Sequence, residues 1–187
     1  MLYLLGGTAR AGKSTIARQF LTQTGIPFFC LDYLMMGLAN GLPEYGVDPD
    51  DDERRVADLL WPVIEPMATA MVENEEDYLL EGVQLLPKHA WALRQKLAGQ
   101  LRVCFVGFAE VDVPVKLAEI RHFGGGPDDW LKELDDQEAL ANIERLKDIS
   151  RYVRDECLKY ELKYVEISAD LGQTVNLVVQ YFRPGLD

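Results

Sequence analysis

The sequence predicts an α/β fold in which a parallel β-sheet of five strands lies between two layers of helices. Short apolar runs alternate along the chain with segments of helical periodicity. Strands that alternate with helices form βαβ units, whose crossovers place helices on both faces of a parallel sheet. The chain has 187 residues, of which 48% are hydrophobic, enough for one packed core. We therefore expect residues 1–187 to form a single domain.

The first two apolar runs enclose a helix near the N-terminus. Met1–Leu5 is a buried-strand candidate that ends in two glycines. Over about Lys13–Thr24 the apolar residues recur at spacings of three and four, which is typical of an amphipathic helix, and Gly25 ends it. Ile26–Leu31 predicts a second strand with Asp32 at its carboxyl end. The chain therefore begins with a strand–helix–strand unit.

Three more strands follow, separated by helical segments. The strands are expected at Tyr78–Gly82, Arg102–Phe108 and Tyr164–Ile167, and helices at about residues 53–74, 88–99, 128–162 and 173–181, with another that ends at about residue 123. Residues 33–52 are expected to be less regular, because they contain Gly37, Gly41, Pro43 and Gly46. Pro62 and Pro66 are expected to bend or divide their helix, since proline removes a backbone hydrogen bond.

The composition is strongly acidic. A total of 31 acidic and 19 basic residues gives a formal net charge of −12. Such a surface repels phosphate backbones, so we expect no nucleic acid as a partner. An anionic ligand must be held by a local pocket of cations and backbone N–H groups. Arg54 and Arg55 follow the acidic run Asp50–Glu53 and are interpreted as partners of those acids rather than as an anion site.

Cysteine usage and hydropathy exclude other classes of protein. The three cysteines are far apart and odd in number, which argues against a disulfide framework or a zinc site. Cys30 and Cys104 lie in apolar runs and are interpreted as small buried hydrophobic residues. No segment reaches about eighteen apolar residues, and the first apolar run lacks the basic start of a signal peptide. We expect a cytoplasmic protein with no membrane partner.

The most specific motif lies between the first strand and the first helix. Residues 7–14 read GTARAGKS and match the pattern GxxxxGK[ST] in full. Gly7 and Gly12 permit backbone angles that let consecutive N–H groups surround phosphate oxygens. The helix that follows points the positive end of its dipole at the same anion. The sequence therefore predicts a nucleotide-binding P-loop, whereas a chance glycine-rich turn would not need this strand–helix context.

The P-loop residues are assigned to the expected cofactors, ATP and Mg²⁺. Lys13 is expected to reach the β- and γ-phosphates, and the hydroxyl of Ser14 to ligate Mg²⁺. Thr15 adds another hydroxyl beside the phosphates. The residues assigned to ATP in this loop are Gly7, Thr8, Ala9, Arg10, Ala11, Gly12, Lys13, Ser14 and Thr15.

Two carboxylates stand at the carboxyl ends of predicted strands, where the ligands of parallel sheets bind. Asp32 is expected to orient a substrate hydroxyl or accept its proton, and the alternative is a helix N-cap. Glu81 is expected either to hold Mg²⁺ through a bound water or to contact the acceptor. The alternative is that its carboxylate only caps the next helix. Gly82 would let the substrate approach closely. We assign Asp32, Glu81 and Gly82 to substrate binding, and Ser14 and Glu81 to the metal.

Arginines after the fourth strand are candidate cations of a lid. Arg121 precedes the glycines at 124–126, and Arg151 lies on the polar helical segment that follows. A glycine hinge before an arginine-bearing helix suits a lid that brings positive charge to the transferring phosphoryl group and excludes water. The alternative is a solvated helix with ordinary ion pairs, which we prefer for Arg145 and Arg154. The residues assigned to catalysis are Lys13, Asp32, Arg121 and Arg151.

Four segments together resemble the P-loop kinases of small molecules and nucleotides, the group that contains adenylate, shikimate, gluconate and chloramphenicol kinases. The segments are GGTARAGKST at residues 6–15, IPFFCLD ending at Asp32, YLLEGVQLLP around Glu81, and ISRYVRDE around Arg151. The chain is most similar to bacterial ATP-binding proteins described as adenylate-kinase-like or 2-phosphoglycerate-kinase-like. Only the first segment is specific by itself, and the others gain weight from their order and spacing.

The resemblance implies a P-loop NTPase fold with strand order 2-3-1-4-5, an acceptor-binding segment at about residues 33–75 and a helical lid at about residues 121–160. It places the acceptor near Asp32, the adenine near Arg121 and the loop at 169–172, and a lid cation at Arg151. The chain lacks an arginine pair like the one with which nucleoside monophosphate kinases hold the acceptor phosphate, and it lacks the zinc cysteines of some lids. This difference favours another small acceptor.

The sequence thus predicts an ATP- and Mg²⁺-dependent phosphotransferase that moves the γ-phosphoryl group to a small-molecule acceptor, through a hydroxyl. A nucleoside monophosphate kinase is one alternative, in which the acceptor is a phosphate. An ATP-binding regulatory switch is another, in which ATP is hydrolysed slowly whatever acceptor is present. The sequence does not identify the acceptor, and it leaves a monomer and a homodimer both open.

Overall fold

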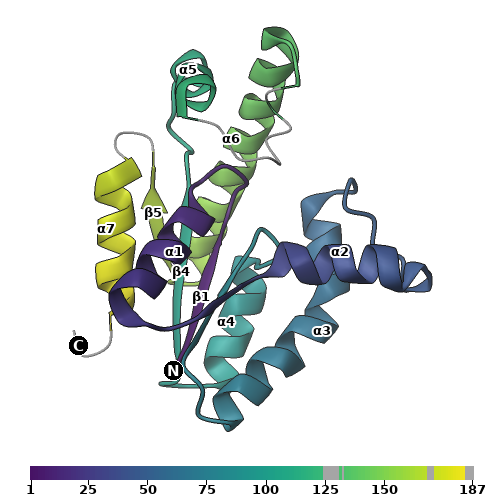
Figure 1. The fold of residues 1–187 in the computed structure, drawn as a ribbon, viewed down its shortest axis with the longest axis vertical. Coiled ribbons are helices and arrows are strands. Elements are labelled where there is room, and N and C mark those ends of the chain that lie inside the picture. The colour runs from purple at the N-terminus through teal and green to yellow at the C-terminus, as the bar shows by residue number, and fades with distance from the viewer. Residues whose placement is uncertain (124–130, 132, 168–170, 184–187) are drawn as a thin grey trace.

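A parallel sheet of five strands forms the centre of the computed structural model, which describes residues 1–123, 131, 133–167 and 171–183 (Figure 1). The strand order is β2-β3-β1-β4-β5, and each neighbouring pair is parallel. The strands are β1 (Leu2–Gly7), β2 (Phe28–Cys30), β3 (Tyr78–Glu81), β4 (Leu101–Gly107) and β5 (Lys163–Glu166). The predicted α/β fold, its strand number and its strand order are confirmed.

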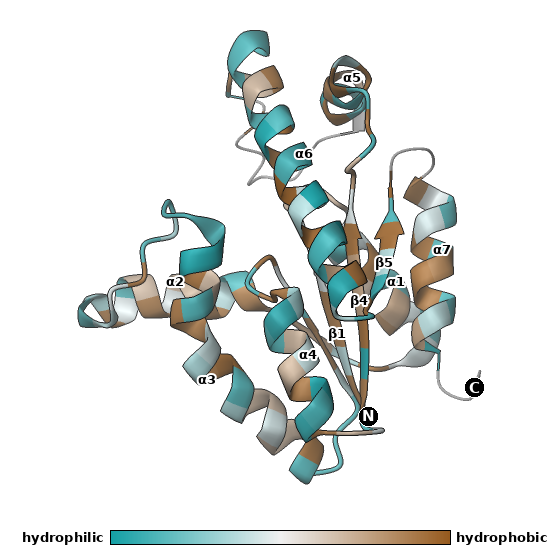
Figure 2. Cartoon of the chain, turned by 180° about the vertical axis from the view of Figure 1, so that it is seen from behind, coloured by the Kyte–Doolittle hydropathy of each residue, from teal (hydrophilic) through white to brown (hydrophobic). Residues whose placement is uncertain are grey.

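Helices cover both faces of this sheet. They are α1 (Lys13–Thr24), α2 (Leu31–Gly41), α3 (Glu53–Glu73), α4 (Pro87–Lys96), α5 (Val113–Phe123), α6 (Asp136–Lys159) and α7 (Leu171–Phe182). Helices α1 and α7 lie together on one face in Figure 1, and α3, α4 and the C-terminal part of α6 lie on the other face in Figure 2. The molecule therefore has the expected three layers.

The position of β1 in the middle of the sheet explains why its residues are all apolar instead of alternating between apolar and polar. Tyr3 and Leu5 pack in the core that contains α1 and α7, whereas Leu2 and Leu4 pack in the core that contains α3 and α4. All four side chains are at most 1% exposed. A strand between two helical layers needs apolar residues on both sides, which is the pattern of Met1–Leu5.

The second strand is shorter than predicted, and a helix replaces part of the segment expected to be irregular. Among the strands that the structure describes, β2 pairs only with β3, and it ends at Cys30. Helix α2 begins at Leu31, whose side chain is fully buried, and its glycines lie outside the first turn. Leucine and methionine favour helix strongly enough to offset those glycines. Asp32 therefore lies in the first turn of α2, and Cys30, rather than Asp32, is the N-cap.

Helix α3 is continuous, so Pro62 and Pro66 do not divide it, and the alternative that they bend it stays a prediction. Pro62 and Pro66 are both exposed, and the helix runs through them. The carbonyl groups left without a backbone donor consequently lie on the solvent side, where water can hydrate them. The opposite face holds Val56, Leu60, Ile64 and Ala68 against the sheet, at the spacing of one helical stripe.

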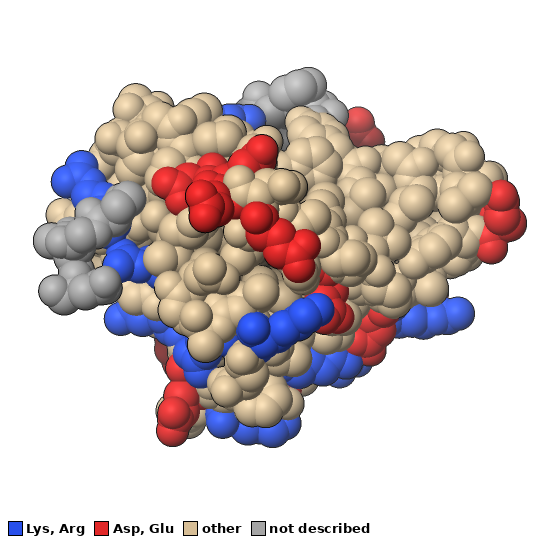
Figure 3. Space-filling view, turned by 90° about the horizontal axis from the view of Figure 1, so that it is seen from below, with Lys and Arg blue, Asp and Glu red and all other residues tan. Residues whose placement is uncertain are grey.

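Charged side chains form small groups of both signs on the surface. Figure 3 looks at the end of the molecule where β1 begins, and acidic groups there lie next to basic groups among many uncharged side chains. The described helices include none that is both long and apolar enough to cross a membrane.

Gly6 of β1 pairs with Phe105 of β4, and its replacement tests the packing of this ring on the strand. A Cβ atom at Gly6 would overlap the ring of Phe105, which is fully buried. We expect Gly6→Ala to lower the free energy of unfolding by about 1–3 kcal/mol, measured by denaturant titration. Gly37→Ala on α2 is the control, because its Cβ would meet nothing within 4 Å. Equal loss in both variants would contradict the packing argument.

Candidate active site

The P-loop is held against β4 where β1 ends. Gly7 and Gly12 have φ values of 128° and 74°, so both glycines use backbone angles that side chains disfavour, as predicted. A Cβ at Gly7 would also overlap the carbonyl oxygen of Val106, and the Thr8 N–H donates to that oxygen at 3.2 Å. Gly7 is therefore required by packing as well as by the shape of the loop.

Lys13 starts α1 and is buried, with 8% of its surface exposed. Its Nζ donates to the carbonyl oxygen of Thr8 at 2.8 Å, across the loop. Burial lowers the pKa of Lys13, while the negative charges of Glu81 and Asp32 act in the opposite direction. Helix α1 has Gly12 as its N-cap and no side-chain cap among the described residues. The ammonium group and the uncapped helix start together make a site that favours an anion.

Glu81 and Ser14 meet beside this anion site. Glu81 ends β3, is 2% exposed and lies opposite Leu5 of β1. The Ser14 hydroxyl donates to Oε1 of Glu81 at 2.8 Å. Within the described chain no group of three or more His, Cys, Asp or Glu side chains could enclose a metal. A hydroxyl and one carboxylate nevertheless suit Mg²⁺, which usually takes one or two carboxylates together with substrate phosphates and waters.

Asp32 is brought to the same edge of the sheet by the start of α2, and its side chain is exposed. Its Oδ1 accepts a hydrogen bond from Nε2 of Gln84 at 2.7 Å. Gln84 follows β3, is fully buried, and was not singled out from the sequence. Asp32 thus has a buried neighbour in the loop after β3, although α2 itself extends away from the sheet (Figure 1).

Cys30 corrects one interpretation of the sequence. Its side chain is half-buried rather than buried, and its Sγ lies 3.6 Å from Oδ2 of Asp32. Burial and the nearby Glu81 and Asp32 carboxylates raise the pKa of Cys30 to about 12, so the thiol stays protonated at neutral pH. An edge strand leaves its last residue open on one side, which explains the exposure. Cys104 on β4 is fully buried, as predicted.

The space beside Gly82 is filled by the protein itself. A Cβ at Gly82 would overlap Oε1 of Gln84 and would lie 2.9 Å from Cβ of Leu31. The absence of a side chain at this position therefore lets Gln84 and α2 approach β3. The predicted contact between Gly82 and the substrate stays a prediction.

A cavity of about 310 Å³ opens next to the P-loop. Its walls come from the end of β1, the loop after β3, the start of α3, and α6. The lining residues are Gly7, Asp52, Glu53, Arg54, Val83, Leu85, Leu86, Arg145, Asp148, Ile149, Tyr152 and Val153. One wall is therefore largely apolar, and the wall at the start of α3 is charged.

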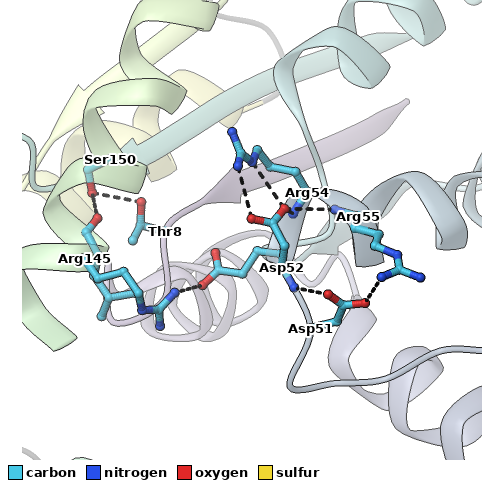
Figure 4. Close-up of polar contacts among 9 residues, drawn as sticks. Thr8, Asp51, Asp52, Arg54, Arg55, Arg145 and Ser150 are labelled. Atoms are coloured by element: carbon cyan, nitrogen blue, oxygen red, sulfur yellow. Dashed lines mark hydrogen bonds and ion pairs between the residues drawn. The ribbon is translucent and has the colours of Figure 1, made fainter.

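One ion pair and one cation–aromatic contact join the charged wall to α6. Figure 4 shows Arg145 extending from α6 toward the start of α3, and its Nη1 lies 3.3 Å from Oε1 of Glu53. Arg54 binds the Asp52 carboxylate through two nitrogens at 3.3 and 3.1 Å, and its guanidinium lies 5.5 Å from the ring centre of Tyr152. The interpretation of Arg54 as a partner of its acidic neighbours is confirmed, but the same residue also lines the cavity.

The arginine that α6 presents to the cavity is Arg145, which sequence reasoning assigned to an ordinary ion pair. Arg145, Ile149 and Tyr152 are spaced by four and three residues and share one helical face. That spacing was a usable signal. Arg151 is not a lining residue and pairs with Asp148 and Glu144 of its own helix, at 2.7 and 3.9 Å.

Arg121 binds the segment that leads into α6. Its guanidinium donates to the carbonyl oxygens of Leu131 and Leu134 at 2.9 and 2.7 Å and pairs with Asp136 at 3.2 Å. The glycine hinge at 124–126 and half of the adenine loop at 169–172 lie outside the described residues. The catalytic and adenine-binding roles of Arg121, and the lid itself, stay predictions.

A buried hydroxyl pair joins α6 to the P-loop. Ser150 donates to the carbonyl oxygen of Leu146 at 3.0 Å and accepts from the N–H of Phe108 at 3.1 Å. Oγ1 of Thr8 lies 2.8 Å from Oγ of Ser150, so Thr8 is the donor that completes this set (Figure 4). Both side chains are at most 1% exposed. Sequence reasoning could not find this contact, because 142 residues separate its partners.

Solved structures with a similar fold include kinases of several small molecules. They include a gluconokinase from Sinorhizobium meliloti 1021, with 18% identity, a TM-score of 0.56, and coverage of 96% of this chain and 89% of that chain. A shikimate kinase from Bacteroides thetaiotaomicron has 17% identity and a TM-score of 0.57, and the alignment covers 96% of this chain and 94% of the shikimate kinase. A deoxyadenosine kinase from M. mycoides has 14% identity and a TM-score of 0.51, and the alignment covers 96% of this chain and 97% of the deoxyadenosine kinase. These similarities show the P-loop α/β fold.

Sequence comparison identifies the family. No curated protein matches the chain. The family model described as chloramphenicol phosphotransferase-like protein matches residues 1–131, which include the P-loop, Asp32 and Glu81. Because this match spans more than half of the 187 residues, the chain belongs to the family of chloramphenicol phosphotransferase-like proteins.

Proposed function

We propose that this protein is an ATP- and Mg²⁺-dependent phosphotransferase that moves the γ-phosphoryl group of ATP to a hydroxyl of a small-molecule acceptor. The convergence of Lys13, the Ser14–Glu81 pair and Asp32 at the carboxyl ends of β1, β3 and β2 carries the proposal. Phosphoryl transfer requires mainly positioning and charge stabilisation, and these groups supply both. Membership of the family supports the same class of reaction.

The P-loop, Gly7–Thr15, is proposed to bind the phosphates of ATP. The ammonium group of Lys13 would exchange its contact with the Thr8 carbonyl for phosphate oxygens, whose charge favours the protonated amine. Mg²⁺, when bound, would neutralise charge on the β- and γ-phosphates, and the Ser14 hydroxyl and the Glu81 carboxylate are the groups that would hold it.

The cavity is proposed to bind the acceptor, and Asp32, which lies outside the residues that line the cavity, is proposed to contact the reactive hydroxyl. Asp32 would accept the hydroxyl proton as the oxygen attacks the γ-phosphorus and ADP leaves. Glu53, Arg54 and Tyr152 come from the two segments proposed as the acceptor-binding region, residues 33–75, and the lid, residues 121–160. Arg121 and Arg151 are proposed as lid cations because of their places around the predicted glycine hinge. The position of Arg145 beside the cavity supports it as a further cation.

A nucleoside monophosphate kinase is the second candidate. Arg54 and Arg145 both line the cavity, which brings together two guanidinium groups that a phosphate acceptor could use. Each of them is already paired with a carboxylate, Asp52 or Glu53, and this favours an acceptor without a phosphate.

One assay separates these candidates from a regulatory switch. ADP release from Mg-ATP is measured alone and with separate pools of nucleosides, nucleoside monophosphates, sugar acids, aminoglycosides and chloramphenicol. A large increase with a non-phosphorylated pool supports the proposal, and an increase with monophosphates supports the second candidate. A slow rate that no pool changes, despite ATP binding, would favour the switch.

Lys13→Ala is expected to lower acceptor-dependent turnover by at least about 100-fold, because it removes the cation that contacts the transferring phosphates. Lys96→Ala on α4 is the matched control, since Lys96 forms an exposed pair with Glu65 away from the P-loop. The control is expected to retain normal turnover. Steady-state ADP release measures both variants, and normal turnover in Lys13→Ala would exclude the proposed function.

Asp32→Asn is expected to lower kcat by about 100-fold or more while the Kd for ATP stays within about twofold, because an amide cannot accept the hydroxyl proton. Asp155→Asn on α6 is the control, since Asp155 pairs with Arg154 at the surface. Turnover assays and calorimetric titration with a non-hydrolysable ATP analogue make the measurement. An equal loss of ATP binding and turnover would assign Asp32 to the nucleotide instead.

A further inference from the structure

Gln84 is a buried amide that contacts the proposed acceptor-binding carboxylate. It lies in the loop after β3, two residues beyond Gly82, and it is fully buried. Its Nε2 donates to Oδ1 of Asp32 at 2.7 Å, a contact between residues that are 52 positions apart. A hydrogen bond to a carboxylate is among the stronger neutral–charged contacts in proteins.

The contact with Asp32 sets the orientation of the amide. Nε2 makes both polar contacts of the side chain, with Asp32 and, at 3.5 Å, with Sδ of Met35. Oε1 is buried and has no hydrogen-bond partner among the residues that the structure describes. The opposite orientation would place Oε1 beside the Asp32 carboxylate, where two acceptors repel. The side chain therefore acts as a donor to Asp32.

Packing alone does not require an amide at this position. A buried carbonyl oxygen without a donor is unfavourable, and an apolar side chain of similar volume would avoid that penalty. Gly82 leaves the room that Oε1 occupies. The amide thus carries the cost of a buried oxygen without a donor, and the hydrogen bond from Nε2 to Asp32 is the contact that offsets this cost.

Asp32 needs such a partner because its own surroundings hold it weakly. Its side chain is exposed, at the first turn of a helix that extends from the sheet. Oδ2 has a long contact of 3.6 Å with Sγ of Cys30, and thiols are weak donors. Without Gln84 the carboxylate would be free to adopt other rotamers.

We propose that Gln84 is a positioning residue, whose amide holds Oδ1 of Asp32 so that Oδ2 faces the acceptor hydroxyl. The inference rests on the proposed function, because it takes Asp32 as the group that receives the hydroxyl proton. It assigns to Gln84 a part in turnover without contact with ATP or with the reacting atoms.

Two substitutions test the proposal with an acceptor found in the assay above. Gln84→Met fills the same space without a donor and is expected to lower kcat by about 10- to 100-fold, with the KM for ATP unchanged and Tm equal or higher. Gln84→Glu keeps the shape but places a second carboxylate beside Asp32, so a larger loss of kcat is expected. A role in packing alone predicts the reverse order, with the near-isosteric Glu variant more active than the Met variant.

Controls and a double substitution complete the test. Gln95→Met makes the same chemical change on the exposed face of α4 and is expected to leave kcat and Tm unchanged. In an Asp32→Asn background, Gln84→Met is expected to cause no further loss, because the carboxylate that it positions is already gone. Normal kcat in Gln84→Met, a parallel loss of kcat and Tm, or additive losses in the double variant would each overturn the proposal.

A readout without turnover separates this proposal from the proposed function. A crystal structure of the wild-type protein is expected to show the Asp32 carboxylate in one position. A crystal structure of Gln84→Met is expected to show it in a different position or in two alternate conformations. An unchanged Asp32 in both would overturn the role of Gln84, even if the protein is a kinase. Failure of every acceptor pool, or normal turnover in Lys13→Ala, would instead reject the proposed function.

Discussion

The buried ammonium group of Lys13 is the charge on which the rest of the site depends. A buried charge is stable only with nearby partners, and each partner here comes from a different part of the chain. The Thr8 carbonyl supplies the direct hydrogen bond, while Glu81 and Asp32 supply negative charge from the ends of neighbouring segments. The strand order β2-β3-β1 brings these segments together, so the negative charges around Lys13 depend on the topology of the sheet.

The residues around Lys13 form two groups with different attachments. Ser14 and Glu81 sit on the first turn of α1 and the end of β3, both parts of the packed core. Asp32 lies in the first turn of α2 with its side chain exposed, next to Leu31, which is buried in the core, and its carboxylate accepts a hydrogen bond from the buried Gln84. The groups assigned to nucleotide and metal therefore lie on elements of the packed core, whereas the Asp32 carboxylate is exposed and is held by the amide of Gln84.

Local sequence patterns were sufficient for the sheet, most helices and the P-loop, because these depend on periodicity and on glycines with positive φ. The beginning of α2 was missed because leucine and methionine outweigh the glycines there. Gln84 and Ser150 escaped prediction for another reason, since their partners lie 52 and 142 residues away. The place of Arg145 beside the cavity could have been predicted, because its helical spacing from Ile149 and Tyr152 identifies the helix face that lines the cavity.

The packing of Gly7 against β4 affects how the motif should be used to recognise function in related chains. Any side chain at this position would overlap the Val106 carbonyl whether or not a nucleotide is ever bound. A descendant that had lost catalysis would thus still be selected to keep this glycine. Its persistence reports the integrity of the sheet, so the retention of Lys13 and Ser14 says more about phosphate binding than the retention of Gly7 does.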